Sequence, residues 1–74
     1  MKEVEIKKQI LLKQIGAKIV YYRTLREMKQ SELARRARIS RSALSRIERG
    51  KYNDNVSVVT LFNICKIITL MLYP

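Results

Sequence analysis

The chain has 74 residues, of which 47% are hydrophobic, and its 16 Lys and Arg residues against 6 Asp and Glu residues give a formal net charge of +10. A chain of this length buries only about 60% of its unfolded surface, which excludes a second core and predicts one domain. The charge indicates a polyanionic partner, nucleic acid or an anionic membrane surface, whereas one cysteine and no histidine exclude an internal disulfide and the usual zinc sites.

The first predicted element covers residues 4–28. Apolar residues recur there at helical spacing, and only Gly16 interrupts the pattern, which weakens a helix without necessarily ending it. The pattern predicts one long helix or two helices joined near residues 14–16. We expect residues 1–14 to form a helical N-terminal extension and residues 15–74 to form the domain. The apolar positions are Val4, Ile10, Leu11, Ile15, Ile19, Tyr22 and Leu25.

A second, shorter helix is predicted over residues 30–37, where small apolar side chains on one stripe allow another helix to approach closely. That stripe consists of Leu33, Ala34 and Ala37. Residues 38–40 break the pattern, and the hydroxyl of Ser40 can cap the next helix by accepting a hydrogen bond from a free backbone N–H. The third helix is predicted from residue 41 to about residue 49, followed by Gly50, where a left-handed residue often ends a helix.

Polar residues 51–55 predict a loop, after which Ser57 can cap a fourth helix from residue 58 to about residue 68. The residues expected to point inward are Leu61, Ile64, Cys65 and Ile68. Residues 69–73 are apolar and precede Pro74, so a strand and a helical turn are equally compatible with them. Together the elements predict an all-α fold, a compact four- to five-helix bundle, with a short C-terminal strand at a dimer interface as an alternative ending.

The third predicted helix has two chemically different faces. At about 100° per residue its arginines and serines fall within about 140° of one another, and its apolar residues lie opposite. Arginine can donate two parallel hydrogen bonds to O6 and N7 of guanine, and serine can donate or accept one. A merely solvated face is the alternative, but the cap, the short preceding helix and the turn favour a surface for a partner. The polar residues are Arg41, Ser42, Ser45, Arg46 and Arg49, and the apolar ones are Ala43, Leu44 and Ile47.

Two segments, QSELA at residues 30–34 and ISRSALSRIERG at residues 39–50, resemble the helix-turn-helix signature of Cro/CI-type repressors, the XRE family. The resemblance covers about residues 15–70 and joins, in register, a Q-x-x-L-A helix, a turn of fixed length and the SRIERG ending. It implies a lambda repressor-like helix-turn-helix fold. The implied function is that of a sequence-specific transcriptional regulator, most simply a repressor, that binds double-stranded DNA.

The resemblance also implies roles for individual residues. The residues that would contact base edges, in the N-terminal half of the recognition helix, are Arg41, Ser42, Ser45 and Arg46. Contacts to the sugar-phosphate backbone would position the protein without reading sequence. The residues implied for these contacts are Gln30, Lys29, Arg49, Lys51, Tyr52 and Asn53. Gln30 would also brace the recognition helix.

Glu48 stands at the edge between the two faces of the third helix, where an acid among arginines needs a structural partner rather than a DNA contact. In similar proteins an arginine seven residues before the glutamine pairs with this glutamate, which implies an ion pair between Arg23 and Glu48. Three residues depart from the family's pattern, since Lys29 replaces its threonine and Glu27 and Arg38 replace two glycines. The change at Arg38 costs most, because a left-handed conformation penalises a residue with a Cβ by roughly 1 kcal/mol.

The long loop after Gly50, residues 53–55 and the apolar ending together resemble HipB-like antitoxins, which bind DNA and a kinase toxin, more than phage repressors. In that group a C-terminal strand pairs with its twin across a dimer axis. Because one short helix contacts few base pairs, we expect a homodimer on a palindromic operator. Two interfaces remain open, besides a frayed tail: the strand, through Met71, Leu72 and Tyr73, and the extension of residues 1–14, through Ile10, Leu11 and Leu12.

Other function classes fit the sequence less well. No histidine, glycine-rich phosphate loop or suitably spaced pair of carboxylates points to an enzyme, and Cys65 is interpreted as a small core residue rather than a nucleophile. The longest apolar stretch, residues 67–73, is far shorter than the roughly 20 residues of a membrane span, and the acidic start does not resemble a signal peptide. We expect a cytoplasmic protein with no cofactor, no metal and no membrane partner; a toxin is the alternative protein partner.

Overall fold

The computed structural model describes residues 2–51 and 57–72, and these residues form four helices. The helices are α1 (Lys2–Leu25), α2 (Gln30–Ala37), α3 (Arg41–Glu48) and α4 (Val58–Leu72). The predicted all-α class is confirmed, and the first predicted element is one continuous helix rather than two. The boundary between residues 14 and 15 stays a prediction. None of the helices, within the described ranges, is both long and apolar enough to cross a membrane.

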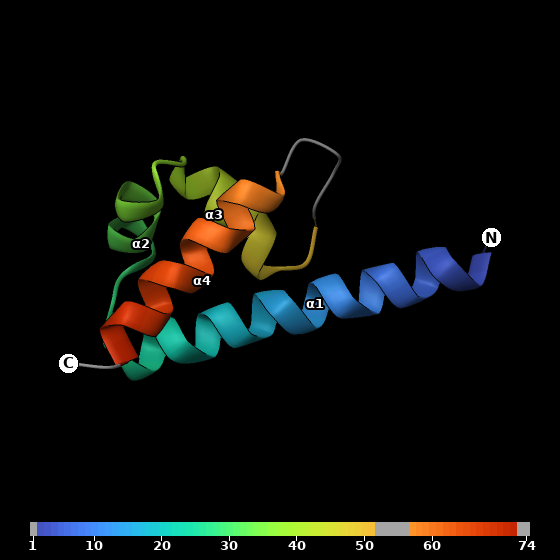
Figure 1. Cartoon of the computed structure of the whole chain (residues 1–74), viewed down its shortest axis with the longest axis horizontal. Helices are drawn as coiled ribbons and strands as arrows, with labels where there is room; N and C mark the ends of the chain where they lie inside the picture. The colour runs from blue at the N-terminus through green and yellow to red at the C-terminus, as the bar shows by residue number, and fades with distance from the viewer. Residues whose placement is uncertain (1, 52–56, 73–74) are drawn as a thin grey trace.

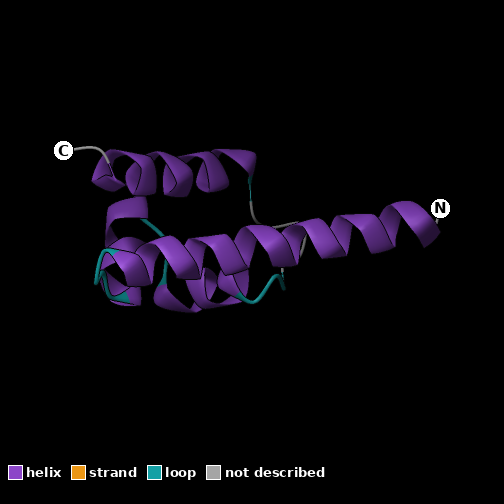
Figure 2. Cartoon of the chain, turned by 90° about the horizontal axis from the view of Figure 1, so that it is seen from below, coloured by secondary structure: helices purple, strands orange, loops and turns teal. Residues whose placement is uncertain are grey.

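The other three helices lie beside the C-terminal half of the long helix α1 (Figure 1). In the view of Figure 2, α4 lies on one side of α1 and α3 on the other, and α2 passes behind the C-terminal end of α1 towards α4. Both α1 and α2 contact α3 and α4. The N-terminal half of α1 projects beyond this globule, which explains why the molecule measures 42 × 21 × 17 Å.

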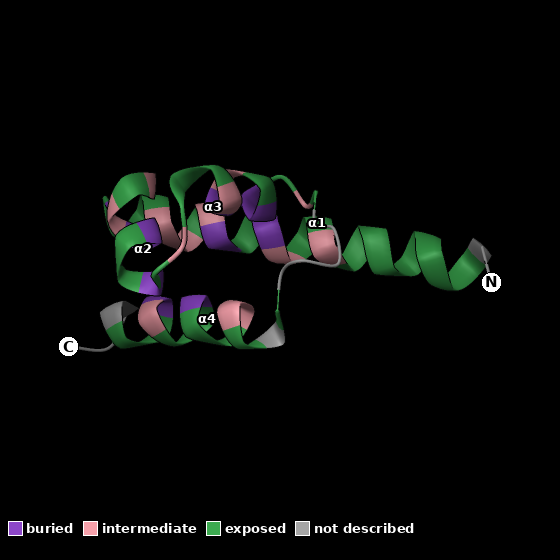
Figure 3. Ribbon diagram, turned by 90° about the horizontal axis from the view of Figure 1, so that it is seen from above, coloured by how far each residue is buried: buried purple, intermediate pink, exposed green. Residues whose placement is uncertain are grey.

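The hydrophobic core lies where the four helices meet, and the projecting half of α1 is almost entirely exposed (Figure 3). Leu33 of α2, Leu44 of α3 and Ile64 of α4 have no exposed surface. From α1 only Ile19 is a buried apolar residue. The buried apolar residues are Ile19, Met28, Leu33, Ala34, Ala37, Leu44, Ile47, Ile64 and Ile68. The predicted inward stripe of α2 is therefore confirmed.

Gly16 marks a close approach between α1 and α3. A Cβ built on Gly16 would lie 2.5 Å from the carbonyl oxygens of both Ile47 and Glu48. These are backbone atoms in the last turn of α3, so they cannot move aside without displacing the helix. The residue that weakens α1 as an isolated helix is the one that lets α3 pack against it.

The first three helices end with the same hydrogen-bond pattern, in which a backbone N–H donates to the carbonyl five residues earlier. The donor and acceptor pairs are Met28 and Arg23 at 3.0 Å, Ile39 and Ala34 at 3.0 Å, and Lys51 and Arg46 at 2.9 Å. The residue before each donor has a positive φ, namely 54° at Glu27, 59° at Arg38 and 70° at Gly50. Only the third of these residues is glycine. At the ends of α1 and α2, a residue with a Cβ therefore adopts the left-handed backbone conformation.

Both predicted serine caps are confirmed. The backbone N–H of Ala43 donates to Oγ of Ser40 at 3.0 Å, which fixes the start of α3. The N–H of Thr60 donates to Oγ of Ser57 at 3.1 Å in the same way at α4. These local contacts explain why both helix starts could be predicted from the sequence.

The alternative of a C-terminal strand is wrong for residues 69–72, because α4 continues to Leu72. The hydroxyl of Thr69 donates to the carbonyl of Cys65 at 2.8 Å, inside the helix. Each residue added to an existing helix gains a backbone hydrogen bond without a new nucleation step, and the described residues contain no strand with which this segment could pair. Tyr73 and Pro74 lie outside the described residues.

The prediction that Cys65 is a core residue is also wrong, because its side chain is exposed. Ile64 and Ile68, four residues apart, define the buried face of α4. Cys65 is turned about 100° from Ile64 and lines an open groove between α1 and α4.

Candidate nucleic-acid interface

The polar face of α3 is open to solvent. Its buried residues Leu44 and Ile47 lie three positions apart on the core side, so the residues between and around them point outward. Because Ser40 fixes the first turn, this outward face begins with the first residue of the helix. The exposed residues are Arg41, Ser42, Arg46 and Arg49, and Ser45 is half-buried.

Two adjoining hollows border this face. The first, of about 560 Å³, lies over the polar face of α3, and the second, of about 590 Å³, lies at the N-terminal end of α2. No described residue that lines either hollow is acidic, and such a surface of guanidinium, ammonium, amide and hydroxyl groups suits a polyanion. The first hollow is lined by Gln30, Arg41, Ser42, Ser45, Arg46 and Arg49, and the second by Arg23, Lys29, Gln30, Ser31 and Arg41.

Beneath this surface, Arg23 of α1 and Glu48 of α3 form a two-point ion pair. Nε of Arg23 donates to Oε2 of Glu48 at 2.8 Å, and Nη2 donates to Oε1 at 3.1 Å. The side chain of Glu48 is only 4% exposed and that of Arg23 is 16% exposed. Nη1 of Arg23 also donates to the carbonyl of Met28 at 3.0 Å. These contacts hold the end of α1, the turn after it and the end of α3 together.

Gln30 connects this buried pair to the surface. Its Nε2 donates to Oε1 of Glu48 at 2.9 Å, and its Oε1 accepts a hydrogen bond from Nε of Arg41 at 3.3 Å. An amide has a donor and an acceptor at fixed positions, so the carboxylate on one side and the guanidinium on the other select one orientation of Gln30. The result is a hydrogen-bonded chain from Arg23 through Glu48 and Gln30 to Arg41.

The other residues expected at the interface lie around its edge. Lys29 precedes α2 and is exposed, and Lys51, three residues after the end of α3, is also exposed. Nε of Arg49 donates to the carbonyl of Ser45 at 3.3 Å, which restrains its side chain along the helix. Tyr52 and Asn53 lie outside the described residues.

Ser31 is absent from the predicted contacts, yet it lines the second hollow. It follows Gln30 in the first turn of α2, and that adjacency is the signal in the sequence that could have identified it.

Two short helices joined by a tight turn, the second of which presents a basic face, define a helix-turn-helix DNA-binding domain. A family model described as helix-turn-helix matches residues 19–68. The chain therefore belongs to the XRE family of helix-turn-helix proteins, the Cro/CI-type DNA-binding transcription regulators. No curated protein matches the chain.

Proposed function

We propose that this chain is a repressor that binds a palindromic operator as a homodimer, with α3 in the major groove. The single observation that carries the proposal is the polar face of α3, which is open over a hollow whose described lining contains no acidic residue, while its opposite face is buried. The residues proposed to contact base edges are Arg41, Ser42, Ser45 and Arg46.

Arg41 is the residue proposed to read a guanine, because a guanidinium can donate to O6 and N7 together. The hydrogen bond that Gln30 accepts from Arg41 supports this role, since it restrains the guanidinium before DNA arrives. A side chain that is already oriented loses less conformational entropy on binding. Specificity at this base pair therefore depends on Gln30 as well as on Arg41.

The contacts proposed for the DNA backbone surround this reading face. Lys29 and Gln30 line the hollow at the start of α2, and Lys51 and Arg49 follow from the end of α3. Cations and amides at these places would bind phosphates on either side of the groove and set the register of α3. The proposed contacts of Tyr52 and Asn53 rest on the sequence resemblance alone.

Repression would follow from occupancy of the operator. A homodimer presents two recognition helices to two half-sites, about one helical turn apart, and so multiplies the specificity of a single short helix. The antitoxin alternative rested on the loop after Gly50, on residues 53–55 and on the apolar ending. Residues 52–56 lie outside the described residues, and residues 69–72 are helical rather than a strand. We therefore propose the regulator without a toxin partner.

The test is a gel-shift titration of the full chain against its own promoter and a scrambled duplex of the same length, at two salt concentrations. At physiological salt the protein should bind the promoter at least about 1000-fold more tightly than it binds the scrambled duplex. Its affinity for both duplexes should fall as the salt concentration rises. Arg41→Ala is the matched variant that should lose preference for the promoter. Equal binding of both duplexes at both salt concentrations would contradict the proposal.

A further inference from the structure

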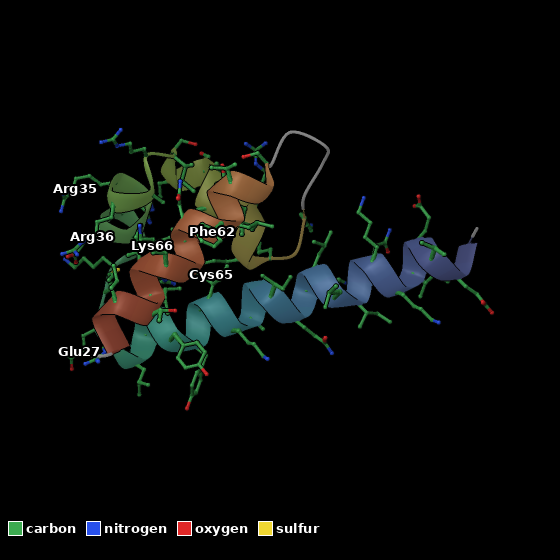
Figure 4. The ribbon with its side chains drawn as sticks, viewed as in Figure 1. Glu27, Arg35, Arg36, Phe62, Cys65 and Lys66 are labelled. Atoms are coloured by element: carbon green, nitrogen blue, oxygen red, sulfur yellow. The ribbon has the colours of Figure 1, made fainter. Side chains whose placement is uncertain are left out.

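Two apolar surfaces are left uncovered by the described residues of the chain. The first is on the projecting half of α1, where Val4 is 70% exposed and Leu11 is 55% exposed. The second is the groove of about 300 Å³ between α1 and α4, whose apolar walls include Cys65 of α4, labelled in Figure 4. Residues that line this groove include Ile15, Lys18, Ile19, Tyr22, Cys65 and Ile68.

The two surfaces are continuous. Val4, Leu11 and Lys18 are spaced seven residues apart, and Ile15 and Tyr22 lie four residues after Leu11 and Lys18, so all five share one stripe of α1. The stripe begins on the projecting half and leads directly into the groove. Because α1 is one unbroken helix, its projecting half cannot fold back into the groove of the same chain.

The charges along α1 select one orientation for a second copy. The acids of α1 are Glu3 and Glu5 in its first turn, and the charged residues that follow are all basic. Within the described residues neither acid forms an ion pair. Two parallel copies would place acid beside acid, whereas two antiparallel copies place Glu3 and Glu5 near Lys18 of the other copy.

We propose that the self-association surface is this stripe, and that its occupant is the projecting half of α1 from a second copy, antiparallel and centred on Leu11. In this register Leu11 meets its own equivalent, and Val4 of each copy lies over Lys18 at the mouth of the other copy's groove. The inference deepens the homodimer of the proposed function by naming its interface. It assigns the extension, rather than the C-terminal end of the chain, to dimerisation.

The first test is sedimentation velocity of the full chain without DNA over a range of concentrations. Leu11→Glu should weaken the dimer by about 100-fold or more, because it removes one leucine from each side and adds two adjacent negative charges. Gln9→Glu is the matched control, since it makes the same charge change about 160° around the helix and should leave the dimer intact. Both positions are exposed, so circular dichroism should show the same helix content for both variants.

The second test reports orientation, with Cys65→Ser as the background. Antiparallel copies predict that Val4→Cys alone gives no covalent dimer under mild oxidation, whereas Val4→Cys combined with Lys18→Cys does. Parallel copies predict that Val4→Cys alone forms the disulfide, which would overturn the proposed orientation.

Three further outcomes would overturn the proposed interface. The parent chain could be monomeric at about 100 µM, or the Leu11→Glu variant could dimerise as tightly as the parent chain. The third outcome is that only Phe62→Glu, on the outer face of α4, abolishes the dimer. Phe62 is 66% exposed, and Figure 4 labels it on α4. Since neither test contains DNA, failure here leaves the DNA-binding proposal to its own gel-shift test.

Discussion

Arg23 and Glu48, separated by 25 positions in the sequence, are joined by two hydrogen bonds of 2.8 and 3.1 Å. The pair connects the last turn of the long helix α1 to the last turn of α3. Because Gln30 donates to the same carboxylate and accepts from Arg41, the pair also determines how the proposed reading face is held. Stability of the fold and orientation of the site therefore depend on one buried carboxylate.

Glu48→Gln should destabilise the protein by about 2 kcal/mol, because it leaves the partly buried guanidinium of Arg23 without its counter-charge. Glu32→Gln is the matched control. Glu32 forms an exposed i,i+4 ion pair with Arg36 at 3.1 Å, and its loss should cost less than about 0.5 kcal/mol. Urea unfolding followed by circular dichroism measures both values. Equal losses in the two variants would show that the buried pair has no special role.

Gly16→Ala should destabilise the protein by about 2 kcal/mol, although alanine favours an isolated helix by about 1 kcal/mol over glycine. The added Cβ would meet the carbonyl oxygens of Ile47 and Glu48 at 2.5 Å and push α3 away from α1. Ala17→Gly, at the exposed neighbouring position, measures the intrinsic preference alone and should cost about 1 kcal/mol. A stabilised Gly16→Ala variant would mean that α1 and α3 do not approach so closely.

Arg38→Gly and Glu27→Gly should each stabilise the fold by about 0.5–1 kcal/mol, because both residues have a φ that glycine adopts without strain. In a domain of this size 1 kcal/mol corresponds to a rise of about 4–8 °C in Tm. Arg38→Ala removes the same charge but keeps the Cβ, so it should give no such gain. If Arg38→Ala raised Tm as much as Arg38→Gly, charge rather than backbone conformation would be the cause.

Gly50→Ala, at the end of α3, should destabilise the fold, in contrast to the two substitutions to glycine. The residue has a φ of 70°, and a Cβ would lie 2.6 Å from Cγ and 2.7 Å from Cα of Lys13. We expect a loss of more than about 1 kcal/mol in the free energy of unfolding, measured under the same conditions as the two glycine variants. An unchanged stability would show that the contact with Lys13 relaxes freely.

Arg41→Ala should reduce discrimination at one base pair by about 1–3 kcal/mol, whereas Lys51→Ala should weaken binding to all sequences alike and lower the salt slope by about one. Titrations against single-base operator variants measure the first effect, and titrations at several salt concentrations measure the second. An Arg41→Ala variant with full sequence preference would exclude Arg41 as a reader.

Gln30→Ala and Arg41→Ala should be coupled in their effects on operator binding by about 0.5–1 kcal/mol, because the amide of Gln30 orients Arg41. Gln30→Ala and Lys51→Ala provide the control pair and should be additive within about 0.5 kcal/mol. Additivity in both pairs would show that the hydrogen bond between Gln30 and Arg41 is lost in the complex.

Features that depend on neighbours in the sequence could be predicted from the sequence by itself. Ser40 caps the helix whose third residue donates to it, Gly50 ends that helix, and helical periodicity alone separates the buried Leu44 from the exposed Arg41. The recognition helix and its two faces follow from such short-range rules. The family membership follows as well, since its motif lies in these same segments.

Only the tertiary structure decided the features that depend on distant parts of the chain. The apolar residues 69–72 suit a strand locally, but an existing helix extends through them. Cys65 has an apolar neighbourhood in the sequence, yet it is exposed because none of the described helices covers that side of α4. The link from Gln30 to both Glu48 and Arg41, and the contact of Gly16 with α3, arise because packing brings three helices to one place, and local periodicity carries no information about that arrangement.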